Sequence, residues 1–92
     1  MIRKAAVLGG AGARYASKAQ FAGADVLITG DIDYHTAQDA LAAGMCLIDP
    51  GHHAEHMMKK PVADLLESLL TGNKYNTEVF PSETDTDPFR TL

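Results

Sequence analysis

The residues best suited to chemistry lie between positions 52 and 56, where three histidines and one glutamate follow an apolar run in "GHHAEH". If a helix begins near Gly51, His52 lies three residues before Glu55 and four before His56, and both spacings put two side chains on one helical face. Imidazole and carboxylate groups placed in this way suit a zinc, iron or manganese ion. The alternative is a solvated first turn, in which the helix dipole favours Glu55. Spacing alone leaves both interpretations open, and one turn offers an incomplete set of ligands.

Two earlier polar segments also follow apolar runs, "GGAGAR" (9–14) and "TGDIDYH" (29–35). The first is either a phosphate-binding turn before a helix or a glycine-rich turn that allows close packing. In the second, Asp33 is either an N-cap or a site residue. Asp31 and His35 are then expected to face the site as substrate contacts or as support for other residues.

The elements that must position these segments alternate between apolar runs and helix-like stretches. We expect an α/β fold, a mostly parallel sheet with flanking helices in the order β-α-β-α-β-α-β. Short apolar runs in which apolar and polar residues do not alternate are typical of strands buried on both faces. Because parallel strands end at one edge of a sheet, the polar segments are expected to meet there. The expected strands are 5–10, 24–30, 44–51 and 77–83, and the expected helices are 14–24, 34–44 and 62–70.

Composition narrows the class of protein. The chain has 92 residues, 8 Lys and Arg against 12 Asp and Glu, and a formal net charge of -4. We therefore expect a single domain over 1–92 that binds no nucleic acid, since no basic cluster exceeds Lys59–Lys60. No apolar run is long enough for a membrane partner. The single cysteine, Cys46, fits a reducing, cytoplasmic setting and is expected to be a buried core thiol.

Three segments, "AVLGGAG", "ADVLITGDIDYHTAQDALAAGMCLIDPGHH" and "SETDTDPF", resemble the C-terminal half of the Nif-three-like family. Its members are also called GTP cyclohydrolase I type 2 homologues or dinuclear-metal-centre hexameric proteins. The resemblance implies an α/β subunit of a toroidal homohexamer, with two divalent metal ions per complete site facing an internal cavity. It implies that His52 is a metal ligand and that Glu55 is the second, with His56 as the alternative to Glu55. Asp31 and His35 are implied to line the same cavity without binding metal directly.

The resemblance also implies that the other ligands belong to an N-terminal half that is absent from this sequence. The chain is thus expected to be a fragment or a separately made C-terminal half, holding half of a dinuclear site. Two functions follow. The first is a metal-dependent hydrolase of a phosphoester or nucleotide-type substrate, in which His35 carries a proton and Asp31 supports the metal shell. The alternative is a non-enzymatic oligomeric or partner-binding module whose metal is structural or vestigial.

Overall fold

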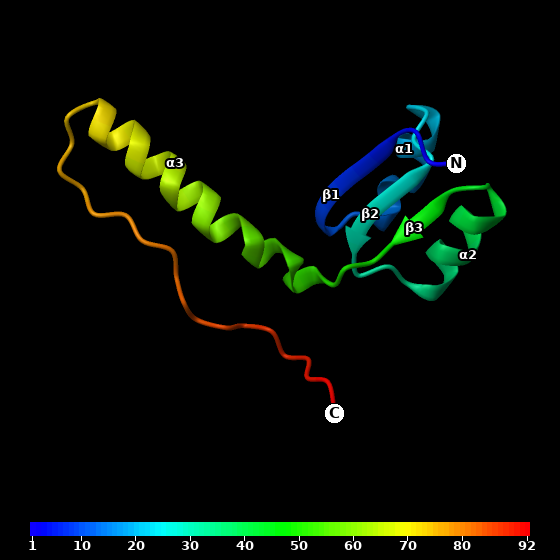
Figure 1. Cartoon of the computed structure of the whole chain (residues 1–92). Coiled ribbons are helices and arrows are strands. Elements are labelled where there is room, and N and C mark those ends of the chain that lie inside the picture. The colour runs from blue at the N-terminus through cyan, green and yellow to red at the C-terminus, as the bar shows by residue number, and fades with distance from the viewer. The chain divides into compact units, whose positions relative to one another are not determined.

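The computed structural model describes residues 1–92, which form two compact units, Met1–Ala54 and Glu55–Leu92. The first unit is a three-stranded parallel sheet with flanking helices, and it confirms the expected α/β class (Figure 1). The sheet order is β1-β2-β3. The elements of this unit are β1 (Ala5–Ala11), the 3-10 helix η1 (Ala13–Tyr15), α1 (Ala16–Phe21), β2 (Val26–Gly30), α2 (Tyr34–Ala42) and β3 (Cys46–Ile48).

Both helices of the first unit pack on one face of the sheet. Ala6, Leu27 and Leu47 are paired across the three strands and contribute one row of side chains to the core. Ala16 of α1 and Ala40 of α2 pack against this row. Two successive right-handed crossovers in a sheet of order 1-2-3 place both helices on the same side. The small alanine side chains let the helices approach the sheet closely.

The opposite face of this sheet is open in the isolated chain. Val7, Ile28 and Ile48 form the next row of paired residues, and Val7 is 73% exposed and Ile48 49% exposed. The expectation of strands buried on both faces was therefore wrong for β1 and β3, whereas β2 is buried or half-buried along its whole length. Cys46 was also expected to be buried and is exposed. Side chains alternate along a strand, so Cys46 and Ile48 point away from the helices when Leu47 points toward them.

Several predicted helix boundaries are confirmed. Gly23 and Gly44 follow α1 and α2 with φ of 84° and 83°, a conformation that favours glycine at a helix C-terminus. Asp33 is the N-cap of α2, since its carboxylate accepts a hydrogen bond from the backbone N–H of Thr36 at 2.9 Å.

The second unit consists mainly of α3 (Lys59–Gly72), preceded by the 3-10 helix η2 (His52–Met58), whose last residues from Glu55 onward belong to this unit. An ion pair between Lys60 and Asp64 at 2.9 Å spans one turn of α3. The Nζ group of the neighbouring Lys59 donates a hydrogen bond to the carbonyl oxygen of Thr84 at 2.9 Å. No helix of the chain is both long and apolar enough to cross a membrane.

The predicted fourth strand, 77–83, does not form, and this segment has no regular secondary structure. Part of it, from Val79 to Ser82, lines a groove with α3 residues such as Val62 and Leu66. Pro81 lacks the N–H that a strand ladder needs, which disfavours strand pairing in this segment.

Candidate functional site

The segments that follow β2 and β3 meet at one edge of the sheet, as predicted. The chain approaches itself closely at Gly30, the last residue of β2. A Cβ atom added to Gly30 would lie 3.0 Å from the backbone nitrogen of His52 and 3.1 Å from the carbonyl oxygen of Gly10. Both neighbours are backbone atoms, which yield less easily than a flexible side chain. Only glycine fits here without moving them, so Gly30 lets the end of β2 lie close to both β1 and the backbone of His52.

Asp31 and His52 form the central contact of this edge. The Asp31 carboxylate oxygen Oδ2 lies 2.6 Å from Nδ1 of His52, and the two side chains are 53% and 54% exposed. Asp31 has a φ of 53°, in the left-handed region that costs most residues energy but that aspartate tolerates better than most. This backbone turn directly follows β2, and it places the Asp31 carboxylate beside the ring of His52.

The Asp31 contact favours one of the two neutral forms of the His52 ring. An ionised carboxylate only accepts hydrogen bonds, so in the neutral imidazole Nδ1 donates to Asp31 and the lone pair lies on Nε2. A histidine that binds metal through one nitrogen usually donates the other N–H to a carboxylate or carbonyl, which orients the ring and raises its basicity. The Asp31–His52 pair has the chemistry of such a ligand and its support.

Asp49 connects the loops that carry Asp31 and His52. Its Oδ2 accepts the backbone N–H of Ile32 at 3.1 Å, and its Oδ1 accepts the backbone N–H of Gly51 at 2.8 Å. Sequence reasoning missed this residue. The available signal was "DPG", because an aspartate that accepts the N–H two residues later is a common turn pattern.

Thr29 fixes the glycine-rich loop after β1. This side chain is 2% exposed; its hydroxyl accepts the N–H of Gly12 at 2.8 Å and donates to the carbonyl oxygen of Gly10 at 3.2 Å. The N–H of Gly12 is therefore engaged inside the protein. This supports the interpretation of "GGAGAR" as a turn for close packing. Arg14 at its end is exposed and contacts the hydroxyl of Tyr15 at 3.2 Å.

His35 and Asp33 lie at the start of α2. Hydrogen bonds from the side chain and backbone of Thr36 hold the pKa of Asp33 below its ordinary value, and His35 adds a smaller effect in the same direction. The exposed ring of His35 packs edge-on against Tyr34, with ring centres 5.5 Å apart. His35 makes no hydrogen bond to Asp31 or His52. The Asp33 carboxylate acts as a helix cap.

The remaining predicted ligands, Glu55 and His56, lie in η2 and are both exposed. No three His, Cys, Asp or Glu side chains gather into a group that could hold a metal ion. The donor types fit a divalent transition metal, since a carboxylate-supported imidazole is a typical ligand. The side chains brought together here are too few to complete the coordination shell of a metal ion.

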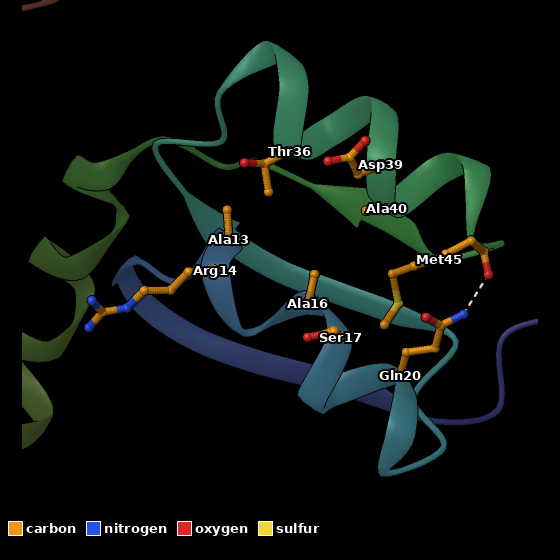
Figure 2. Close-up of a pocket in the computed structure, with 10 residues that line it drawn as sticks. Ala13, Arg14, Ala16, Ser17, Gln20, Thr36, Asp39, Ala40 and Met45 are labelled. Carbon is orange, nitrogen blue, oxygen red and sulfur yellow. Dashed lines mark hydrogen bonds between the residues drawn. The ribbon is translucent and has the colours of Figure 1, made fainter.

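A separate cavity of about 200 Å³ lies between α1 and α2 and is lined by none of the predicted metal ligands (Figure 2). Its walls include Ala13, Ala16 and Ala40, with Ser17 and Asp39 among its polar residues. Figure 2 shows that the Arg14 side chain points away from this cavity. The small alanines of the helix contact account for the space.

Comparison with known proteins places the chain in a family. The family model Duf34/NIF3 (NGG1p interacting factor 3) matches residues 1–88. A protein of Halalkalibacterium halodurans called "GTP cyclohydrolase 1 type 2 homolog" is 52% identical over 88 residues, covering 96% of this chain and 24% of that protein. A Bacillus subtilis protein of the same name is 47% identical over 92 residues, covering 100% of this chain and 25% of that protein.

Solved structures agree with this assignment. The Bacillus cereus protein related to NIF3 superposes with a TM-score of 0.90 at 44% identity, covering 99% of this chain and 25% of that one. A hypothetical protein of Staphylococcus aureus gives a TM-score of 0.89 at 41% identity, covering 96% of this chain and 29% of that one. The chain thus spans about a quarter of the length of the curated relatives it matches. Matches of this extent in sequence and in structure establish that the chain belongs to the Duf34/NIF3 family.

Proposed function

We propose that this chain provides half of a dinuclear site for divalent metal ions, zinc, iron or manganese, with His52 and Glu55 as its ligands. The observation that carries the proposal is the 2.6 Å contact between the Asp31 carboxylate and Nδ1 of His52. This contact favours the tautomer in which Nε2 of His52 carries the lone pair that binds metal. The other half of the ligand set comes from chain segments outside these 92 residues.

Glu55 is the better candidate for the second ligand, and His56 is its alternative. The segment His52–Met58 is a 3-10 helix, with three residues per turn. Residues three positions apart therefore lie on the same face of such a helix, whereas residues four apart do not. The local helix type supports a pairing of His52 with Glu55 over one with His56.

The reaction we propose is hydrolysis of a phosphoester or nucleotide-type substrate. His52 and Glu55, with ligands from elsewhere, would hold the metal pair, which would lower the pKa of a water and stabilise the charge that develops on oxygen. Asp31 orients the His52 ring and compensates its charge. His35 carries a proton between the site and solvent. Arg14, exposed at the end of the β1 loop, offers a cation for a phosphate group.

A second candidate function is assembly with other protein, as a homohexamer or with another partner. The observation that favours it is the extent of exposed apolar surface on both units. In the first unit this is the row that includes Val7 and Ile48; in the second it is an α3 stripe that includes Leu65, 59% exposed, and Leu69, 54% exposed. Large apolar surfaces of this kind mark sites of association. This function is compatible with a metal site whose role is structural.

The metal proposal is tested by the metal content of protein purified without an affinity tag, measured by mass spectrometry. The variants are His52→Ala, Glu55→Ala and His56→Ala, with His35→Ala as the control because His35 is assigned no metal contact. We expect bound transition metal in the wild type and in the His35 variant, and its loss in the His52 and Glu55 variants. Absence of metal from wild-type protein after incubation with zinc and with manganese would refute the half-site. Loss in the His56 variant instead of the Glu55 variant would identify His56 as the second ligand.

Hydrolysis is tested separately, on the metal-loaded protein with a chromogenic phosphodiester. Loss of turnover in the His35 variant with metal content retained supports the proton-carrier role. Full metal occupancy without any turnover, together with association seen by analytical ultracentrifugation, favours the assembly function.

A further inference from the structure

The carboxylate of Asp49 bridges the two residues that flank the Asp31–His52 contact. Its Oδ2 receives the N–H of Ile32, which directly follows Asp31, and its Oδ1 receives the N–H of Gly51, which directly precedes His52. One side chain therefore holds the backbone next to each partner of the 2.6 Å contact.

We propose that Asp49 is a positioning residue that holds Asp31 against His52 and so selects the tautomer of His52. In relation to metal binding the inference rests on the function proposed above, whereas its effect on the tautomer is a property of the metal-free protein. Asp31 alone cannot ensure the contact, because its left-handed φ of 53° is a conformation that the chain leaves unless neighbouring contacts maintain it. The bond from Ile32 N–H to Asp49 supplies such a contact one residue later.

The bridge requires a group that accepts two hydrogen bonds in different directions. A carboxylate has two acceptor oxygens, whereas the amide of asparagine has one oxygen and one NH₂ group that only donates. In Asp49→Asn, one of the two backbone N–H groups must therefore face another donor. Asp49→Ser has a hydroxyl short enough to keep the turn with Gly51 but too short to reach Ile32.

Asp25 provides a matched control at the other end of the sheet. Its Oδ2 accepts the backbone N–H groups of Arg3 and Lys4 at 2.8 and 2.9 Å, so it too joins two chain segments through a carboxylate. Asp25→Asn keeps one acceptor oxygen but removes the negative charge, so it weakens both hydrogen bonds without touching the loops of Asp31 and His52. A general loss of stability would affect both aspartate variants, and only the Asp49 variants should change the ring of His52.

The experiment measures the ¹⁵N chemical shifts of Nδ1 and Nε2 of His52 in metal-free protein, at a pH where the ring is neutral. We expect wild type and Asp25→Asn to show the proton on Nδ1. In Asp49→Asn and Asp49→Ser, we expect both shifts to move toward the averaged values of two interconverting tautomers. If Asp49→Asn does not fold, Asp49→Ser carries the test, because it keeps the turn with Gly51.

The proposal is overturned if folded Asp49 variants keep the wild-type shifts, or if Asp25→Asn changes them to the same degree. For zinc, we expect about a tenfold loss of affinity in the Asp49 variants, the lower end of what second ligand shells contribute. A change of tautomer in protein that binds no zinc in any form would support the role of Asp49 and refute the metal site. The ring shifts thus test the role of Asp49, and zinc binding separately tests the metal site.

Discussion

Replacing Gly30 by alanine should both destabilise the first unit and loosen the Asp31–His52 contact. The added Cβ would lie 3.0 Å from the nitrogen and 3.1 Å from the Cα of His52. Non-bonded heavy atoms of this kind prefer about 3.5 Å or more, so the loop of His52 must move by roughly 0.4 Å. Crowding of a packed site costs about 1–3 kcal/mol. Replacing glycine also restricts the unfolded chain, which offsets about 0.4–1 kcal/mol of that cost.

The expected net effect is therefore a loss of roughly 1–2 kcal/mol in the free energy of unfolding. If His52 takes the whole displacement away from β2, the 2.6 Å hydrogen bond with Asp31 lengthens and weakens. The matched control is Gly72→Ala, because a Cβ at this last residue of α3 meets nothing within 4 Å. That variant should be as stable as wild type or more stable by up to about 1 kcal/mol.

Urea unfolding followed by circular dichroism gives both free energies by linear extrapolation. The ¹⁵N shifts of the His52 ring in the folded variants report whether the contact with Asp31 has weakened. Equal stability of Gly30→Ala and Gly72→Ala would refute the close approach at Gly30. A destabilised Gly30 variant with an unchanged His52 ring would show that the loop relaxes without moving the site.

Three further predictions follow from single residues. Thr29→Val leaves the N–H of Gly12 without its buried partner and should cost about 1–3 kcal/mol in urea unfolding, whereas Thr29→Ser should keep most of the stability. The backbone N–H groups of Arg3 and Lys4 lower the pKa of Asp25, so its contribution to stability is present above the ordinary pKa and is lost as the pH falls through the lower, folded value. Asp25→Asn should thus be less stable than wild type at pH 7 and lose less of its stability on acidification, and parallel pH profiles of the two would contradict this. The exposed thiol of Cys46 should react with a disulfide reagent at a rate that denaturant barely raises, and a large acceleration by denaturant would show that it is buried.

Much of the first unit could be predicted from hydrophobic patterns and glycine positions. Short apolar runs ending in glycine or aspartate predicted β1, β2 and β3, and Gly23 and Gly44 marked the helix ends. The rule that parallel strands end at one edge predicted that the loops of Asp31 and His52 meet. These predictions depend on local sequence and on general rules of topology, which is why they were confirmed.

Other features depend on packing partners that local sequence does not reveal. Cys46 lies in an apolar run typical of a strand with two buried faces, yet in β3 only Leu47 packs against the core, and Cys46 and Ile48 are exposed. The segment 77–83 has strand-like residues, but it joins no ladder and lines a groove together with residues of α3. Asp49 was missed because its role depends on the distance between two loops. Single-sequence patterns contain no such distance.

The central claim is that His52 presents Nε2 to a metal ion while Asp31 holds Nδ1. It is tested most directly by a crystal structure of the protein soaked in zinc, with anomalous diffraction recorded at the zinc edge. The claim predicts a peak about 2.0–2.1 Å from Nε2 of His52, with Asp31 still bonded to Nδ1. Zinc bound elsewhere with none at His52, or zinc bound to Nδ1 with Asp31 displaced, would contradict it.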